Sequence, residues 1–350
     1  MGEILGIGCT HRPLMLGPDE TWTRFIKMAL QDPDMPDEWK DSSRWPVEML
    51  EELGKDFGLS SAGKARKVFK QRFAETLKTI DEFDPDLIII WGDDQYENFQ
   101  EDLIPPFAIL AYQDQEIFPW TDSNQLENPW SETEDFAYTI YGHQKAGKHL
   151  TEELIKDGFD MSYGYKPLHH PLGHSFKNTI LLLDDDRNGF KYPVLPFHVN
   201  CYGRRVNIAR GLRLPLSMKE NMVNLDPPSP NPSRCMEVGA ATARIMAESP
   251  YKTVLMASSS WSHSFLTEKN YQLWPDVQAD KTLYKALKLG DYDFWRSYQT
   301  EEIENSGQHE LLNWFCLMGA MEALNRKPSK SSFIETYAFV SCAVFADYRP

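Results

Sequence analysis

Two short apolar runs in this chain each stop at side chains that can bind a metal ion. One run, at residues 85–91, is followed by Asp93, Asp94 and Gln95. The other run, at residues 3–9, is followed by His11. Imidazole nitrogen and carboxylate or carbonyl oxygen are common ligands of divalent metals, so the two segments together predict a metal site. The alternative is that His11 is a hydrogen-bonded structural residue, the commoner role of a lone histidine beside a strand.

Buried parallel strands are the elements that would bring these segments together. Apolar runs bounded by Pro and Gly are typical of such strands, and open α/β sheets bind ligands beyond the carboxyl ends of their strands. Two further strands, predicted at 192–199 and 253–258, also end in polar residues, which include His198, Asn200 and His263. We therefore expect one crevice at the carboxyl end of a sheet. Taken alone, His263 is equally well explained as a buried structural histidine.

The remaining segments alternate between predicted helices and strands. Helices are predicted at 63–83, 143–156, 233–246 and 305–324, with Ser233 as the N-cap of the third, and extended segments at 159–163 and 336–345. This alternation, without an internal repeat, indicates a single α/β domain over residues 1–350, with a mostly parallel or mixed central sheet flanked by helices. The polar segment 17–61 is predicted to be a partly helical insertion that covers the crevice, or else a disordered loop.

Composition excludes several classes of protein. The formal net charge of −16 argues against a nucleic-acid-binding surface, because phosphate contacts require a basic face. The five cysteines are scattered singly, so we expect buried free thiols in a reducing cytoplasm. No apolar run approaches the roughly 18 residues that a membrane span requires, and no secretory leader is recognised. We therefore expect a soluble, cytoplasmic protein that binds neither nucleic acid nor membrane.

Several segments, in order along the chain, resemble the class III (LigB-type) extradiol ring-cleavage dioxygenases, the family of protocatechuate 4,5-dioxygenase β subunits. The matching segments are 6–13, 85–99, 104–109, 173–174, 193–200, 227–235, 262–263 and 306–314. The resemblance implies a LigB-like fold, with added segments at about 17–61 and 201–225. Such additions reshape a pocket mouth or an oligomer contact, and here they favour a homo-oligomer over a required second subunit.

In that family two histidines and one glutamate hold Fe(II), leaving positions open for a catecholate and O₂. The resemblance places His11 at the first histidine and Glu310 at the glutamate. Gln95 stands where the second histidine is expected, and an amide oxygen is a weaker donor than imidazole nitrogen. Asp93 or Asp94 is the alternative ligand, and a site that has lost its metal is the third possibility.

Further roles follow from the resemblance. His174 corresponds to the histidine that transfers protons during catalysis, with His170 as the alternative because the register of this segment is uncertain. His263 corresponds to a substrate-pocket residue. Other assignments do not come from the family pattern: Tyr96, beside Gln95, is placed to reach a ring substrate, and His198, which has no counterpart in the family, is at most pocket lining. Arg204 or Arg205 is a candidate anchor for a carboxylated phenol.

The resemblance therefore implies an enzyme of aromatic catabolism, a non-haem Fe(II) dioxygenase that cleaves a catechol-like or aminophenol-like ring with O₂. The altered residue at Gln95 leaves two alternatives open. The chain is then a non-catalytic paralogue or partner subunit of such an enzyme, or a metal-dependent enzyme of different chemistry.

Overall fold

A single eight-stranded mixed sheet forms the centre of the computed structural model, which describes residues 2–121, 128–220 and 225–350. The strands, in spatial order, are β6 (Ser162–Gly164), β3 (Phe107–Leu110), β7 (Val194–Val199), β2 (Leu87–Gly92), β8 (Thr253–Ser258), β1 (Ile4–Cys9), β10 (Ala343–Tyr348) and β9 (Lys330–Ile334). The central strands β7, β2, β8 and β1 are mutually parallel. Strand β10 is antiparallel to β1 and β9, and β3 is antiparallel to β7. The predicted α/β fold with a mixed sheet is confirmed.

The four central strands are buried on both faces, which explains their unbroken apolar sequences. Ile88, Ile89 and Ile90 of β2 are fully buried, and every residue of β1 and β8 is buried as well. A strand covered on both faces has no solvent side, so its sequence does not alternate with polar residues. Because the four strands are parallel, their carboxyl ends lie at the same edge of the sheet, as the sequence predicted.

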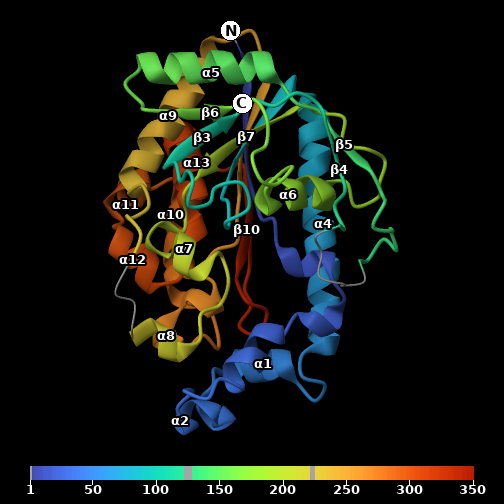
Figure 1. The fold of residues 1–350 in the computed structure, drawn as a ribbon, viewed down its shortest axis with the longest axis vertical. Helices are drawn as coiled ribbons and strands as arrows, with labels where there is room; N and C mark the ends of the chain where they lie inside the picture. The colour runs from blue at the N-terminus through green and yellow to red at the C-terminus, as the bar shows by residue number, and fades with distance from the viewer. Residues whose placement is uncertain (1, 122–127, 221–224) are drawn as a thin grey trace.

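Helices cover both faces of the sheet (Figure 1). Helices α4 (Leu59–Phe83) and α6 (His174–Leu183) lie on one face, and α9 (Pro232–Glu248) and α13 (Leu312–Ala323) on the other. Two glycines let α9 and α13 approach closely, since a Cβ atom at Gly239 would lie 1.8 Å from the carbonyl oxygen of Cys316. At Gly319 it would lie 1.9 Å from that of Met236. This packing fixes α13 against the central strands.

The segment 17–61 is built of short helices and turns. These helices are α1 (Arg24–Leu30), α2 (Asp37–Lys40) and α3 (Val47–Leu53). In Figure 1, α1 and α2 lie at the end of the molecule opposite α5 (Gln144–Lys156). Aromatic contacts attach the segment to the rest of the chain: the rings of Phe25 and Phe265 stack with centroids 5.0 Å apart, and those of Trp39 and Tyr271 are 4.7 Å apart.

The remaining helices and strands are short or peripheral. They are β4 (Gln115–Ile117), β5 (Tyr138–Ile140), α7 (Val206–Ala209), α8 (Leu216–Glu220), α10 (Val277–Leu289), α11 (Tyr292–Ser297) and α12 (Thr300–Asn305). Within the described residues, no helix has the length and apolar character needed to cross a membrane. Part of the predicted insertion at 201–225, residues 221–224, lies outside the described residues.

Several predicted boundaries are wrong; the extended segment expected at 159–163, for example, is strand β6 at Ser162–Gly164. The helix expected at 305–324 begins only at Leu312, after a 3-10 turn at His309–Leu311. Ser233 is not the N-cap of α9, because the side chain of Asn231 accepts the hydrogen bond from the backbone N–H of Arg234 at 2.8 Å. The capping side chain lies one residue before the proline that opens the helix, a favoured place for proline.

The strand expected at 336–345 is also wrong, since β10 begins at Ala343. Its apolar residues are buried as predicted, but they lie in a loop around a buried arginine. Arg12 donates to the carbonyl oxygens of Phe339 and Ser341, which a strand would have used in its ladder. The apolar pattern of this segment correctly predicted that its side chains are buried. The hydrogen bonds from Arg12 explain why its backbone forms a loop and not a strand.

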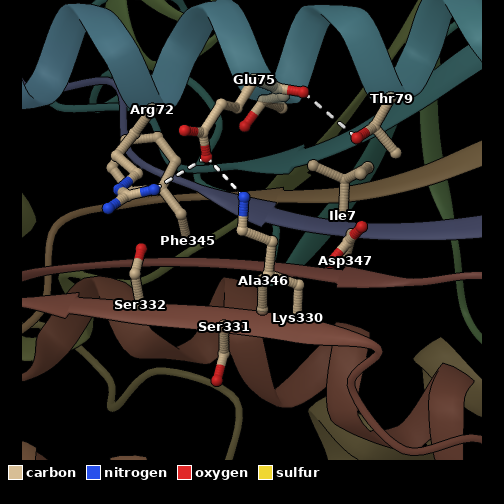
Figure 2. A pocket seen from close by; sticks show the side chains of 11 residues that line it. Ile7, Arg72, Glu75, Thr79, Lys330, Ser331, Ser332, Phe345, Ala346 and Asp347 are labelled. Carbon is tan, nitrogen blue, oxygen red and sulfur yellow. Dashed lines mark hydrogen bonds and ion pairs between the residues drawn. The ribbon is translucent and has the colours of Figure 1, made fainter.

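Charged side chains join α4 to the edge strand β9 at a small pocket of about 40 Å³ (Figure 2). The carboxylate of Glu75 accepts hydrogen bonds from Lys330 at 2.6 Å, Arg72 at 2.7 Å and Gln71 at 2.9 Å. We call Glu75 with these three partners the Glu75 cluster. Its carboxylate is satisfied entirely by the chain's own donors.

Candidate metal centre

A cavity of about 410 Å³ lies at the carboxyl ends of the central strands. It brings together five side chains predicted as site residues, namely His11, Gln95, His174, His263 and Glu310. Arg24 and Phe25 of α1 also line it, together with Phe265. The segment 17–61, which was predicted to cover the crevice, therefore contributes part of the cavity wall.

His11 directly follows β1 and is held by the neighbouring strand. Its Nδ1 atom lies 3.1 Å from the carbonyl oxygen of Ser258, the last residue of β8. A proton on Nδ1 is required for that bond, so the lone pair of Nε2 is left facing Glu310 Oε2 at 3.4 Å. Burial and the charge of His174 lower the pKa of His11 well below its ordinary value. A neutral imidazole whose other nitrogen is fixed by a carbonyl is the form that binds metals.

Glu310 enters the cavity from the 3-10 turn before α13 and is buried. Its carboxylate accepts from Tyr202 Oη at 3.0 Å, from the backbone N–H of Ser260 at 3.2 Å and from Gln95 Nε2 at 3.1 Å. Burial, together with the negative charge of Asp93, raises the pKa of Glu310 well above its ordinary value. His263 Nε2 lies 3.3 Å from Glu310 Oε1, which places His263 beside the predicted ligand.

Gln95 is held by hydrogen bonds through its amide nitrogen. Nε2 donates to Tyr202 Oη at 2.5 Å and to Glu310 Oε1 at 3.1 Å. Gly211 packs directly on this side chain, since a Cβ atom there would lie 2.3 Å from Gln95 Cβ, and its φ of +69° also favours glycine. Gln95 therefore lies in the cavity, as predicted, but its amide nitrogen is already hydrogen-bonded to Tyr202 and Glu310.

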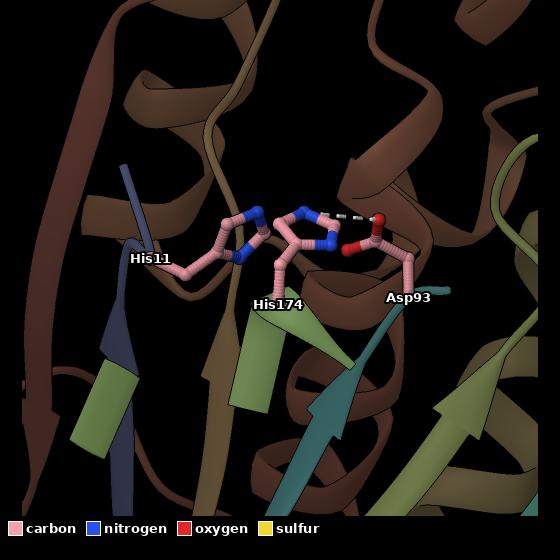
Figure 3. A group of neighbouring side chains, drawn as sticks. All are labelled: His11, Asp93 and His174. Carbon is pink, nitrogen blue, oxygen red and sulfur yellow. Dashed lines mark ion pairs between the residues drawn. The ribbon is translucent and has the colours of Figure 1, made fainter. Parts of the chain in front are cut away.

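Asp93, at the end of β2, is fully buried. Among the described residues neither of its carboxylate oxygens has a hydrogen-bond partner. Its nearest ion pair is with His174 Nε2, at 4.0 Å (Figure 3). Burial, opposed in part by the charge of His174, raises the pKa of Asp93 to about 6. One ligand atom from each of His11, Asp93 and His174 lies within 4.8 Å of the others.

His174 is the first residue of α6 and is paired with Glu97. Its Nδ1 atom and its backbone N–H each lie 2.8 Å from a carboxylate oxygen of Glu97. Burial alone would lower the pKa of His174, but the charges of Glu97, Asp93 and Glu310 outweigh it and raise that pKa to about 9. The pKa of Glu97 falls to about 2, because the charge and hydrogen bond of His174 outweigh the effect of burial. The pair thus holds a proton on His174, whose Nε2 atom faces Asp93.

His170 lies in an adjacent cavity of about 340 Å³, which shares His174 and Asn178 with the first. Its Nδ1 atom accepts from the backbone N–H of Leu172 at 3.3 Å. Within the described residues, His174 lines the main cavity and His170 does not. This placement favours His174 over His170 as the proton-transfer residue, whose role remains a prediction.

Two predicted substrate-binding residues are not brought to the cavity. The hydroxyl of Tyr96 donates to Glu101, and the guanidinium of Arg210 lies 4.4 Å from the centre of its ring. His198 is buried on β7 against Phe99, with ring centroids 4.4 Å apart, and burial lowers its pKa to about 3. Neither Tyr96 nor His198 is among the described residues that line the cavity.

The two predicted anchors for a carboxylate also lie elsewhere. Arg204 pairs with Glu304 at 3.3 Å and Arg205 with Glu268 at 2.7 Å, and all four line a separate pocket. Sequence reasoning missed Arg24, Tyr202 and Glu97. Of these, Glu97 had a signal, since it lies two residues after Gln95, whereas Arg24 and Tyr202 lie in the added segments and follow no motif.

Comparison with known proteins shows what this chain resembles. Residues 218–346, which include His263 and Glu310, match the family described as the catalytic LigB subunit of aromatic ring-opening dioxygenase. The chain is also 22% identical, over 212 residues, to a 2,3-dihydroxyphenylpropionate/2,3-dihydroxicinnamic acid 1,2-dioxygenase of Photorhabdus laumondii. That alignment covers 61% of this chain and 54% of the relative, so the chain matches about half the relative's length. The resemblance to the LigB-type ring-cleavage dioxygenases is confirmed.

Proposed function

We propose that this protein is a metal-dependent dioxygenase that uses O₂ to cleave the ring of a catechol-like or aminophenol-like aromatic. The observation that carries the proposal is the buried contact between His11 Nε2 and Glu310 in a cavity of suitable size. The family resemblance gives the class of reaction, and the relative named above acts on dihydroxylated phenylpropionate and cinnamate.

The side chains at this site fit Fe(II). His11 and Glu310 would hold the ion, with Gln95 or Asp93 as a further ligand. Imidazole and carboxylate ligands with open positions suit Fe(II) oxygenases, and bound iron would supply a place for substrate oxygens and O₂ to meet and exchange electrons. The buried carboxylates of Asp93 and Glu310 supply the negative charge that a divalent cation requires.

The chain's own residues bind the substrate and handle protons. Phe25 and Phe265 form an apolar wall suited to an aromatic ring. His174, held by Glu97, places Nε2 at the cavity, where it can take a phenolic proton when neutral and return one when protonated. Arg24, on the same wall, forms no ion pair with any described residue and can bind an anionic substituent of the substrate.

A cytoplasmic homo-oligomer is part of the same proposal. All five cysteines are free and buried, which suits a reducing compartment. Self-association would allow the added segments to replace a second type of subunit. Light scattering on the purified protein tests it, and a monomer at working concentration would contradict it.

A second candidate function is favoured by Gln95. Its amide donates to Glu310 in the way that a ligand-free pocket would need. A non-catalytic paralogue, or a partner of an active subunit, is therefore the competing proposal.

Metal content separates the two. After anaerobic loading with Fe(II), we expect roughly one bound iron per chain. We expect His11→Ala and Glu310→Ala to lose this iron, since the first removes an imidazole ligand and the second a carboxylate ligand. Oxygen uptake with catechol, protocatechuate, gallate, 2-aminophenol and 2,3-dihydroxyphenylpropionate then tests turnover. A folded protein that binds no metal and consumes no oxygen would support the non-catalytic role.

A further inference from the structure

We propose that Asp93, and not Gln95, completes the metal site with His11 and Glu310. The inference rests on the proposed function, because it concerns the metal that function needs. It assigns to this chain a centre with one imidazole and two carboxylates. His174 adjoins that centre, with Nε2 facing Asp93 (Figure 3).

Gln95 is committed to other contacts. Its hydrogen bonds to Tyr202 and Glu310 both use the amide nitrogen, which cannot bind a cation. The backbone of Gly211 packs on the Cβ and Cγ atoms and limits movement of the side chain. To turn its oxygen to a metal, Gln95 would give up a bond to Tyr202, whose hydroxyl also binds Glu310.

Asp94 is committed as well. Its carboxylate accepts from the backbone N–H groups of Glu97 at 2.8 Å, Asn98 at 2.9 Å and Phe99 at 3.2 Å. These bonds close the turn that follows β2, in the manner of an Asx turn. Recruiting Asp94 to a metal would leave buried backbone donors without partners, which is costly.

Asp93 has no such commitment. Its side chain is fully buried. The side chain of Asn313 lies near enough to lower the pKa of Asp93, but within the described residues neither carboxylate oxygen has a partner with hydrogen-bond geometry. Its backbone is fixed, because Ser175 Oγ donates to its carbonyl oxygen at 2.6 Å and so attaches the end of β2 to α6. The carboxylate is therefore held in place beside His174 by main-chain contacts, while its own oxygens remain available.

The charges around Asp93 call for a cation. No lysine or arginine of the described chain pairs with it, and its nearest cationic group, His174, lies 4.0 Å away. Glu310 is buried as well, and the negative charge of Asp93 helps to raise its pKa, so two carboxylates influence each other out of contact with solvent. A buried carboxylate without a partner costs several kcal/mol unless a positive charge compensates it. A divalent ion ligated by Asp93, His11 and Glu310 would satisfy both carboxylates at once.

Metal affinity of three proteins tests the assignment. Co(II) and Fe(II) affinities are measured anaerobically, by competition with a chelator, for the wild type, Asp93→Asn and Gln95→Ala. We expect Asp93→Asn to weaken binding by at least about tenfold, since even the outer partners of metal ligands contribute that much, and Gln95→Ala by less. The reverse order of the two variants would overturn the proposal and make Gln95 the ligand.

Thermal unfolding supplies a readout that a merely structural role would not produce. Asp93→Asn removes a buried, unpaired charge while keeping its shape. We therefore expect the metal-free variant to unfold at or above the wild-type temperature, and its metal-dependent rise in Tm to be smaller. A variant with lower metal-free stability and an undiminished metal-dependent rise would contradict the proposal.

A second variant, Asp93→Cys, tests the proposal by the appearance of a new absorption band and can be used if Asp93→Asn folds poorly. Asp93→Cys places a thiolate at the proposed ligand position, and a thiolate bound to Co(II) gives a charge-transfer absorption in the near ultraviolet. We expect that band in Asp93→Cys and not in the wild type; its absence from a folded, Co(II)-loaded variant would overturn the proposal.

Failure of the two proposals can be told apart. If the wild type binds metal and Asp93→Asn binds it equally well, the Asp93 assignment is wrong and the proposed function stands. If the wild type binds no metal, both are wrong.

Discussion

Glu75, on a helix that packs against the sheet, and Asp93, directly after strand β2, are carboxylates in opposite electrostatic conditions. Glu75 accepts from three side chains and is partly open to solvent, and these bonds, led by that of Lys330, lower its pKa to about 2 (Figure 2). Asp93 is fully buried without a hydrogen-bond partner among the described residues, and burial raises its pKa to about 6 (Figure 3). The chain itself supplies hydrogen-bond partners for Glu75 and supplies none for the carboxylate of Asp93 among the described residues.

The two regions show how a structural carboxylate differs from a functional one. A protein that folds around its own ion pairs satisfies them, so unsatisfied buried charge is rare and needs an explanation. Such groups cluster at functional sites, where a ligand supplies the missing partner. The two regions therefore predict opposite responses to substitution.

The largest effect is expected at His174. His174→Gln keeps a hydrogen bond to Glu97 but cannot transfer a proton, so we expect kcat to fall by about 10²–10⁴-fold with metal content unchanged. Steady-state oxygen uptake and elemental analysis measure the two quantities. Loss of metal from the variant would instead make His174 a ligand, in keeping with its 4.8 Å grouping with His11 and Asp93.

A smaller, selective effect is expected at Arg24. Removing the cation in Arg24→Ala should raise KM for a carboxylated catechol by about 10-fold or more, since a hydrogen bond to a charged group contributes about 1.5–3 kcal/mol. The KM for unsubstituted catechol should change little, and Arg204→Ala, outside the cavity, serves as the matched control. Equal effects on both substrates would show that Arg24 only shapes the wall.

The Glu97–His174 pair predicts a pH-dependent stability in the metal-free protein. The pKa of His174 is raised from 6.5 to about 9, so its contribution is complete below pH 6.5 and is lost as pH rises through about 9. The pKa of Glu97 is lowered from 4.5 to about 2, so its contribution is complete above pH 4.5 and is lost as pH falls through about 2.

Substitution of the carboxylate tests that window. Glu97→Gln should lower the free energy of unfolding by about 1–3 kcal/mol near pH 5.5, where both groups are charged. The difference from the wild type should shrink as the pH is raised past about 9, as urea unfolding at several pH values would show. A constant difference would mean that His174 is not the titrating partner.

The smallest effect is expected in the Glu75 cluster. Glu75→Gln removes a partly exposed pair, so we expect a loss of about 1 kcal/mol or less, further reduced by salt, with metal affinity unchanged. Chemical unfolding at low and high salt measures it. A change in metal affinity would contradict the separation of the two regions.

Much of the fold could be predicted because its signals are local. Strand β8 lies at the predicted residues 253–258, β1 lies within the predicted run 3–9, and β2 ends one residue after the predicted run 85–91. Their apolar sequences report burial, and parallel strands bring their carboxyl ends to one edge. That geometry explains why His11 and Gln95 line the same cavity, although they are 84 positions apart in the sequence.

Side-chain direction was decided by the tertiary structure. Sequence could not show that Tyr96 and His198 face away from the cavity, or that Arg24 of an added segment lines it, because each depends on packing against distant residues. The wrong strand at 336–345 has the same origin, since Arg12 took its carbonyl groups.

The chemical groups of this protein, and the strand ends at which they stand, follow from the amino-acid sequence. Which of these groups remain unpaired depends on how the chain folds. Gln95 and Asp94 are satisfied by neighbours from other segments or the following turn, and Asp93 is not. Whether a polar group has a partner depends on the three-dimensional arrangement of donors around it, and no spacing along the chain encodes that arrangement.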